Sequence, residues 1–224
     1  VQVVNLVVGH LTMSPLLSNL RSWQLYHDYH HRWPQKHGAQ LDVYRYLATR
    51  DGLSKASLLT RLGYRLPGGF LLWILGGIYR RATLPRSIPE LVRNDSERRR
   101  VRTSALCTLG LVALLWTALG LVGGPAAILK YHLAPAVVAI LLGSLIITVQ
   151  HTNMDSLFYG AEGWTPLRGQ VVSTFDVRFP RLLEWLWCDI NLHIPHHVSP
   201  RIPWYHLRRA AKVLATAYPG YYQE

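Results

Sequence analysis

Histidines are the residues of this sequence whose type and spacing point most directly to chemistry. The spacing H-x-x-H-H occurs twice, in the segments L-Y-H-D-Y-H-H and N-L-H-I-P-H-H. The residues concerned are His27, His30, His31, His193, His196 and His197. Because positions i, i+3 and i+4 lie on one side of a helical turn, each set presents its imidazoles together. Imidazole is the commonest side-chain ligand of metal ions, so the repeated spacing predicts a metal site.

The number of imidazoles indicates more than one metal ion. Six or seven exceed what one tetrahedral zinc ion needs, and they suit two ions with several nitrogen ligands each. Imidazole accepts zinc, copper, iron and nickel, so the ligand type does not select the metal. Asp28 and Asp189 could accept the second ring N–H of a bound imidazole, with helix capping or solvation as an equal alternative. For the clusters themselves, the alternative is a solvated histidine-rich surface.

The composition indicates that these clusters belong to a membrane protein. Half of the 224 residues are hydrophobic and only 16% are charged, whereas soluble proteins average about 25% charged residues. The net charge of +12 would suit nucleic acid or an anionic membrane. The basic residues stand beside the apolar runs, and the sequence has no zinc-finger or RNA-binding signature. We therefore expect no nucleic-acid partner.

Two uncharged runs predict a transmembrane hairpin at about 104–149. Ser104 to Val122 is long enough to cross a bilayer as a helix. Gly123, Gly124 and Pro125 form a turn, and Leu133 to Val149 leads back. The fold class that we predict is therefore all-α, as a multi-pass integral membrane protein. We treat residues 1–224 as a single domain.

The side of the membrane follows from the arginine-rich segment Arg80 to Arg102, which precedes the hairpin. Positive segments stay in the cytoplasm, so the hairpin brings His151 to the same cytoplasmic side as both histidine clusters. Pro67 to Tyr79 is apolar but too short to span, which predicts an interfacial or re-entrant piece. A cytoplasmic cap is predicted at about 21–66, 80–102 and 150–224.

Three passages resemble the membrane fatty-acid desaturases, most closely the acyl-lipid Δ12 (ω-6) desaturases of cyanobacteria and plastids. They are V-G-H-L-T-M-S-P-L-L with R-S-W-Q-L-Y-H-D-Y-H-H, the Q-H-T at Gln150 to Thr152, and L-E-W-L-W-C-D-I-N-L-H-I-P-H-H-V-S-P-R-I-P-W-Y-H-L-R-R-A. The resemblance spans nearly the whole chain, although residues 51–145 agree mainly in hydropathy. It implies a non-haem centre of two Fe ions that uses O₂ to desaturate a fatty acyl chain, in a bacterial inner membrane or a cyanobacterial or thylakoid membrane.

The resemblance also implies the ligands. The family's second and third histidine boxes correspond to the two clusters, and an extra ligand corresponds to His151. The implied metal ligands are His27, His30, His31, His151, His193, His196 and His197. The first box, H-x-x-x-H, precedes in the family the passage that matches Val1 onward, and it is absent. We therefore expect an N-terminally truncated fragment that is inactive by itself and loads iron only partially.

The resemblance implies a membrane lipid as acyl substrate and a separate electron donor, ferredoxin or alternatively cytochrome b5. Arg21, Gln24 and Trp33 depart from the closest relatives, which leaves the double-bond position open. One alternative is a histidine-box hydroxylase or ketolase acting on a carotenoid or another lipid, although the I-P-H-H-V-S-P-R-I-P passage favours desaturation. The other is a membrane metal transporter or sensor. That function favours charged ligands within the spans, and the two long apolar runs contain none.

The third box also predicts local structure. Pro195 is accepted in the first turn of a helix, so a helix is expected to begin there, with His193 just before it. Adjacent residues on a helix point about 100° apart. His196 and His197 are therefore expected to face two different metal ions.

Overall fold

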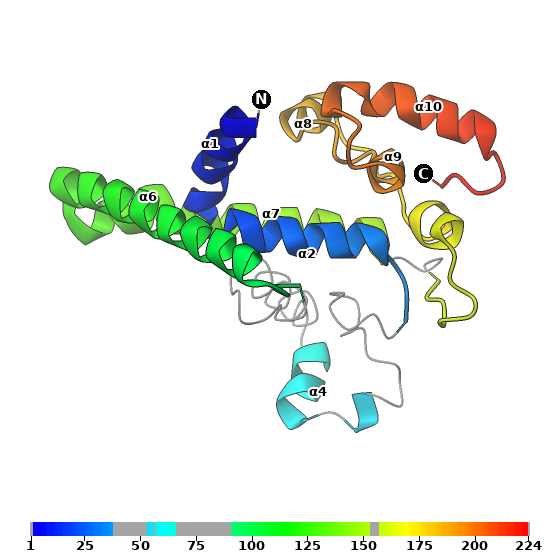
Figure 1. Ribbon diagram of the computed structural model, residues 1–224, viewed down its shortest axis with the longest axis horizontal. Coiled ribbons are helices and arrows are strands. Elements are labelled where there is room, and N and C mark those ends of the chain that lie inside the picture. Colours follow the sequence, from blue (N-terminus) through cyan, green and yellow to red (C-terminus); the bar gives the residue numbers. More distant parts are fainter. Residues whose placement is uncertain (1, 38–52, 56, 66–90, 153–156, 224) are drawn as a thin grey trace. The chain divides into compact units, whose positions relative to one another are not determined.

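The regular elements in the part of the chain that the structure describes are helices. A computed structural model describes residues 2–37, 53–55, 57–65, 91–152 and 157–223 (Figure 1). Within these ranges there is no named strand, and one isolated parallel bridge joins Lys36 and Tyr159. The all-α prediction is thus confirmed for the described residues. The segment Pro67 to Tyr79, predicted to be interfacial or re-entrant, lies outside them.

The chain forms two compact units, 1–28 with 48–144 and 29–47 with 145–224. The first unit contains α1 (Gln2–Met13), η1 (Ser14–Leu16), α4 (Leu58–Arg65), α6 (Asp95–Ile128) and η4 (Leu129–Leu133). The second contains η5 (Arg168–Val172), α8 (Arg181–Leu186), α9 (His193–Val198), η6 (Trp204–His206) and α10 (Leu207–Ala217). Two helices, α2 (Leu20–Arg32) and α7 (Ala134–His151), begin in the first unit and end in the second.

Helix α6 breaks where the sequence predicts, but it begins at Asp95, before the apolar run that starts at Ser104. The Asn94 side chain accepts a hydrogen bond of 2.8 Å from the Glu97 N–H, which caps the first turn. The helix is interrupted at Gly123 (φ −151°, ψ 19°) and Gly124 (φ 64°, ψ −162°). The turn expected at these two glycines is therefore confirmed. Pro125 then stands at the start of the next helical stretch, where its missing N–H costs nothing.

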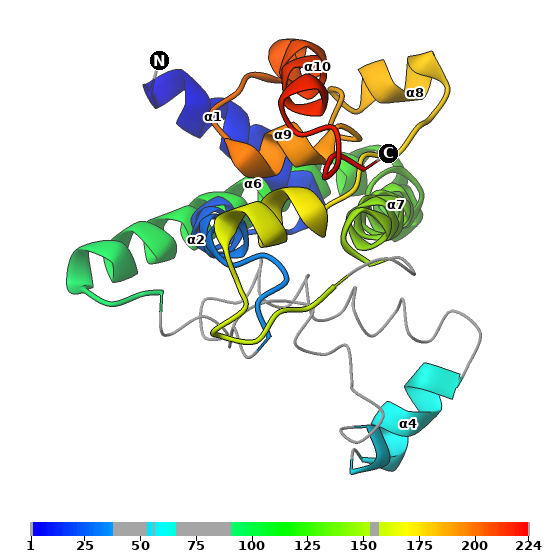
Figure 2. The same ribbon diagram turned by 90° about the vertical axis from the view of Figure 1, so that its right-hand side faces the viewer.

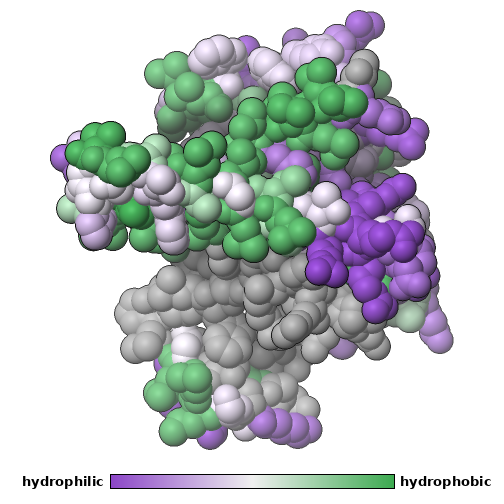
Figure 3. Space-filling model, turned by 60° about the vertical axis from the view of Figure 1, so that its left-hand side comes forward, coloured by the Kyte–Doolittle hydropathy of each residue, from purple (hydrophilic) through white to green (hydrophobic). Residues whose placement is uncertain are grey.

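The buried and exposed faces of α6 are the reverse of those in a water-soluble helix. Ser104 and Thr108 are buried, whereas Leu114, Leu121 and Val122 are 69%, 84% and 88% exposed. Figure 3 shows hydrophobic residues gathered over much of the described surface on one face of the molecule. Small polar residues inside and leucines outside are typical of a helix surrounded by lipid.

By length and composition, the described chain has one helical stretch apolar enough to cross a membrane, Asp95–His151. A second candidate is the pair Gln2–Leu16 and Leu20–Arg32, which is bent by 94°. These two stretches are the described candidates for membrane spans.

Within the first unit, His132 joins segments that are far apart in the sequence. Its side chain is buried, and its Nδ1 accepts a 2.8 Å hydrogen bond from the Trp116 indole N–H. Because indole can only donate, the imidazole proton must be on Nε2, which lies 2.8 Å from the Pro15 carbonyl oxygen. His132 therefore has a structural role.

The Gly124 backbone gives a testable prediction. Its combination of φ and ψ is open essentially to glycine alone, so Gly124→Ala should lower the free energy of unfolding by about 1–3 kcal/mol through backbone strain. A Cβ at this position would meet nothing within 4 Å, so no steric clash contributes. Thermal or denaturant unfolding in detergent micelles measures the effect.

Gly120→Ala is the matched control, since its Cβ would also meet nothing within 4 Å and it lies inside the same helix. Its greater helix propensity should leave stability unchanged or raise it by up to about 1 kcal/mol. Equal effects of the two substitutions would contradict a special backbone conformation at Gly124.

Candidate metal centre

The first histidine cluster lies at the carboxyl-terminal end of α2. His30 and His31 are buried and belong to the second unit. His27 lies one helical turn before His31 on the same helix, and therefore on the same side of it. Because adjacent residues of a helix point about 100° apart, the His30 and His31 imidazoles leave α2 in different directions.

His151 is the last residue of α7, and its side chain is completely buried. The backbone carbonyl of a final helical residue has no partner within the helix. Here the buried Gln35 amide donates to it, and also to the Ser173 carbonyl oxygen at 3.1 Å. Gln35 thereby fixes the position at which the His151 imidazole leaves its helix.

The third box forms α9, which begins at His193 and not at Pro195 as predicted. Pro195 still occupies the first turn, where a helix needs no backbone donor, so the proline does not mark the start. One free N–H of this turn, on Ile194, donates to Asp176 Oδ1 at 2.9 Å. Tyr222 donates its hydroxyl hydrogen to the other oxygen of Asp176. These contacts supply a helix start that the sequence pattern did not reveal.

Four imidazoles from the three segments converge through their Nε2 atoms. The distance is 3.1 Å from His30 to His151, 2.9 Å from His193 to His151 and 3.1 Å from His197 to His193. All four residues are buried, and their ligand atoms lie within 4.8 Å of one another. Two ligands about 2.1 Å from one metal ion and 90° apart would be separated by about 3.0 Å. The spacing therefore has the dimensions of a metal coordination sphere.

A second convergence involves the histidines next to these. His31 Nε2 lies 3.1 Å from His196 Nε2, and both residues belong to the second unit. The neighbours His196 and His197 therefore face different groups, as the 100° rotation between adjacent helix positions requires. His30 and His31 divide in the same way.

Burial favours the neutral form of the three histidines of α9. It lowers the pKa of His193 and His197 well below the usual 6.5, and neighbouring imidazoles lower both further. The pKa of His196 is lowered to about 4, first by burial and then by His30. Neutral imidazole is the form that binds a metal ion, so the ligands are ready at neutral pH.

Hydrogen bonding among the rings alone does not account for the first group. Each Nε2 of a neutral imidazole carries either one proton or one lone pair. His151 and His193 each have two Nε2 neighbours at about hydrogen-bond distance. Four such atoms can form at most two hydrogen bonds with one another, so they cannot satisfy all three of these contacts. A single cation, in contrast, can accept a lone pair from each of the four Nε2 atoms. The residues present therefore fit a metal ion.

The comparisons with known proteins agree with this site. The fatty acid desaturase family model matches residues 1–224. The chain belongs to the fatty acid desaturase family. A family member in Synechocystis, the sn-1 oleoyl-lipid 12-desaturase, is 31% identical over 92% of this chain and 58% of its own length. The resemblance seen in the histidine boxes is thus confirmed.

Two further desaturases show the same extent of similarity. The sn-1 oleoyl-lipid 12-desaturase of Arthrospira platensis is 29% identical over 94% of this chain and 58% of its own length. The chloroplastic omega-6 fatty acid desaturase of Glycine max is 29% identical over 100% of this chain and 51% of its own length. The chain therefore spans somewhat more than half the length of these curated relatives.

The two candidate carboxylate partners, Asp28 and Asp189, have the following surroundings. Asp189 accepts a hydrogen bond of 2.9 Å from Arg208 Nε, where an imidazole was expected. A guanidinium offers a carboxylate two parallel donors, which an imidazole cannot match. Asp28 is exposed on α2. The buried carboxylate that supports the histidines is that of Asp176, through the α9 backbone.

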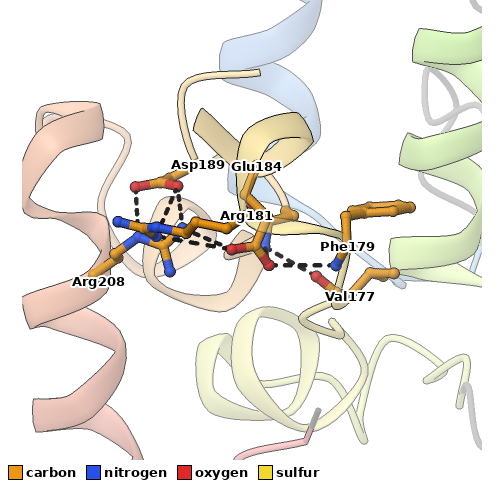
Figure 4. A network of polar contacts seen from close by, with 7 residues as sticks. Val177, Phe179, Arg181, Glu184, Asp189 and Arg208 are labelled. Carbon is orange, nitrogen blue, oxygen red and sulfur yellow. Dashed lines mark hydrogen bonds and ion pairs between the residues drawn. The ribbon is translucent and has the colours of Figure 1, made fainter. Parts of the chain in front are cut away.

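The Asp189 carboxylate belongs to a network that fixes the chain just before α9 (Figure 4). Arg208 on α10 also donates to Glu184 at 2.7 Å. Glu184 is buried and accepts a further bond from the Asn191 amide at 3.1 Å. Figures 1 and 2 both show α10 beside α9, consistent with the contacts between them. This network orients the residues that lead into His193.

Sequence reasoning missed the amides that hold the histidine segments. The Gln150 amide donates to the Ile190 carbonyl at 2.8 Å, and that of Gln170 to the His31 carbonyl at 3.2 Å. Together with the Gln35 amide, these amides form hydrogen bonds between residues that are 40 to 139 positions apart in the sequence. No spacing marks them, because their partners are backbone carbonyls that any residue type supplies.

The lowered histidine pKa values give a second prediction. Between pH 7 and 5 the unfolded chain binds protons at histidines that stay neutral when folded. The free energy of unfolding of the metal-free chain should therefore fall with acid, by up to about 1.4 kcal/mol per pH unit for each such histidine below pH 6.5. Denaturant titrations with a chelator present measure this slope.

Two variants identify the source of the slope. His196→Gln should make it shallower, because one histidine with a lowered pKa is removed. His206→Gln should leave the slope of the free energy of unfolding against pH unchanged, since His206 is exposed and outside both groups. A stability that does not change between pH 7 and 5 would contradict neutral, buried imidazoles.

Proposed function

We propose that this chain provides histidine ligands to a non-haem di-iron centre that desaturates fatty acyl chains with O₂. One observation carries the proposal: imidazoles from α2, α7 and α9 converge, within a chain of the fatty acid desaturase family. The proposed ligands are His27, His30, His31, His151, His193, His196 and His197. The proposed domain is the whole chain, 1–224.

The two convergences support two metal ions. His30, His151, His193 and His197 would hold the first ion. His31 and His196 would hold the second, with His27 as a further ligand from the same side of α2. In α2, His30 would bind the first ion and His31 the second. In α9, His197 would bind the first ion and His196 the second, so each helix would contact both ions. Such sharing keeps the two ions close together.

The bound iron would supply the oxidising power, together with O₂, that no amino-acid side chain has. Desaturation forms one C=C bond from a CH₂–CH₂ unit, and two added electrons and two protons balance the reduction of O₂ to two water molecules. The chain's own residues keep the imidazoles neutral and exclude water from them. Gln35, Asp176 and the Glu184 network hold the ligand-bearing backbone in place.

A membrane setting supports this assignment. The exposed leucines of α6 and the apolar stretch Asp95–His151 fit lipid contact. We propose a multi-pass protein with a hairpin at about 104–149 and a cytoplasmic histidine cap, in a bacterial or cyanobacterial membrane. The basic residues Arg98, Arg99 and Arg100 at the start of α6 favour that orientation. They would also attract an acidic electron donor, for which ferredoxin is proposed.

The substrate is proposed from the relatives. The cyanobacterial proteins are named sn-1 oleoyl-lipid 12-desaturases and the plant protein an omega-6 desaturase. By this similarity we assign a lipid-bound acyl chain and a Δ12-type double bond. The outcome at one specific carbon requires a fixed acyl position relative to the metal ions, which rigid ligand geometry supports.

Expression in a host that lacks polyunsaturated lipids tests the proposal. The complete reading frame that contains this sequence is expressed with a ferredoxin, and fatty acids are analysed by gas chromatography with mass spectrometry. A dienoic acid with a new double bond at position 12 is the expected product. His197→Ala should abolish it, because a buried ligand of the first group is lost.

His206→Ala is the matched control and should retain the product, since His206 is exposed and outside both groups. Folded, iron-loaded protein that forms no new double bond would contradict desaturation. A hydroxylated fatty acid in place of the diene would support the related hydroxylase chemistry.

A further inference from the structure

The first turns of α6 carry exposed arginines that the metal site does not use. They are Arg98, Arg99, Arg100 and Arg102. Within the described part of the chain, none of these four side chains forms a hydrogen bond or an ion pair. A guanidinium stays protonated at any ordinary pH, so this stretch presents a permanent positive charge to its surroundings.

The carboxylates of the same stretch do not balance this charge. Its two acidic residues are Asp95 and Glu97. Glu97 is already bound by Arg21, whose Nε and Nη2 atoms lie 2.5 and 2.8 Å from its two carboxylate oxygens. Of the two, Asp95 alone remains to offset the four exposed arginines. The start of α6 therefore suits an anion.

Polar contacts within the first unit determine which side of α6 faces outward. The Asn19 amide donates to the Val101 carbonyl at 3.1 Å, and Ser104 Oγ accepts a hydrogen bond of 3.1 Å from the Arg21 N–H. Val101, Ser104 and Thr108 are spaced three and four residues apart, and all three are buried. They form one side of the helix. The opposite side is thereby held outward.

The outward side changes from arginine to leucine along the helix. Arg98, Arg99, Arg102, Leu106 and Leu109 follow one another at helical spacing and are all exposed, the two leucines by 60% and 65%. We call these five residues the α6 stripe. Arg102 and Leu106 are about 6 Å apart along the axis, and the head-group layer on each side of a bilayer is about 5–8 Å thick. The change from arginine to leucine therefore matches the distance from lipid phosphate to acyl chain.

This combination favours an anion that is attached to an apolar chain. A soluble anion would bind the arginines and leave the exposed leucines in water. An uncharged lipid would cover the leucines and leave the arginines without a partner. Clusters of arginine and lysine immediately before a membrane helix are typical of proteins that bind anionic lipids. An anionic lipid is the ligand that uses both parts of the stripe.

We propose that the α6 stripe binds an anionic phospholipid. Arg98, Arg99 and Arg102 would donate to the phosphate oxygens, which a guanidinium can contact through two parallel N–H groups. One acyl chain would lie along Leu106 and Leu109. The proposal rests on the proposed function only in placing this end of α6 at a membrane surface. It concerns binding, so it is tested without iron and without turnover.

The test is electron paramagnetic resonance of spin-labelled lipids. Protein from the complete reading frame is reconstituted in phosphatidylcholine bilayers with a trace of spin-labelled phosphatidylglycerol or spin-labelled phosphatidylcholine. Lipid held at the protein is restricted in its motion, and the restricted fraction gives the relative association of the two lipids. We expect phosphatidylglycerol to associate at least about fivefold more strongly, since one arginine at an anionic lipid surface contributes a factor of that size.

Two variants locate the preference. Arg98→Gln combined with Arg102→Gln should reduce it to about twofold or less, because two of the three phosphate donors are lost. Arg100→Gln is the matched control and should keep most of the preference. It removes a charge from the same turn, but residues two positions apart on a helix do not share a side. Arg100 also has an electrostatic partner in Glu97. Circular dichroism confirms that each variant is folded.

Several results would overturn the proposal. Equal association of the two lipids would exclude an anionic lipid site, and equal losses in Arg100→Gln and the double variant would show diffuse attraction. Displacement of the labelled phosphatidylglycerol by an excess of inorganic phosphate would show an anion site that does not use the leucines. If the double variant weakened the binding of purified ferredoxin and left the lipid preference unchanged, the surface would be a protein-docking site.

Failure of this proposal is distinguishable from failure of the proposed function. Restricted lipid of both kinds without a preference would contradict the α6 stripe and leave the membrane setting intact. The absence of any restricted lipid would contradict the membrane setting itself, and the stripe with it. Neither result depends on iron or on the formation of a double bond.

Discussion

The second unit depends on one constraint, the close approach of four buried imidazole nitrogens. The ligand atoms of His30, His151, His193 and His197 lie within 4.8 Å of one another, and all four residues are buried. A proton on any of them would be a buried charge among like charges, which is why the pKa values of His193 and His197 are lowered. The arrangement is favourable only when the rings are neutral and share a cation. A metal ion satisfies both conditions at once.

Such a cluster has to be held by groups outside it. Buried hydrogen bonds are strong when every partner is satisfied, and they fix a backbone more firmly than apolar contact does. Gln35 at the end of α7, Asp176 at the start of α9 and the Glu184–Arg208 network act in this way. Each bonds to backbone or to a charged partner and leaves the imidazole rings to face one another. These contacts within the second unit thereby hold the backbone that carries His151 and His193.

The parts that the sequence predicted are those governed by local periodicity. Helix periodicity predicted that His196 and His197 face different metal ions, and Gly123 and Gly124 marked the break in α6. The family resemblance supplied His151, whose position at the end of α7 no spacing would reveal. Local rules were thus sufficient wherever the determining residues are neighbours.

The parts that failed depend on distant partners. For Asp189 the sequence left a bound imidazole and capping or solvation as equal alternatives, and it did not reveal Arg208, 19 residues further along the chain, which binds it. The start of α9 was placed at Pro195, whereas Asp176 stabilises a start at His193. A side chain bonding to a backbone carbonyl leaves no pattern in the sequence, so Gln35 could not be found either.

X-ray absorption spectroscopy can show whether the clustered histidines hold iron. Protein from the complete reading frame is purified, iron is quantified, and the iron edge is measured for the wild type and for His197→Ala. We expect imidazole nitrogen scattering at about 2.1 Å and a second iron nearby, with iron content reduced in the variant. Iron that shows no imidazole scattering, or an unchanged iron content in His197→Ala, would contradict it.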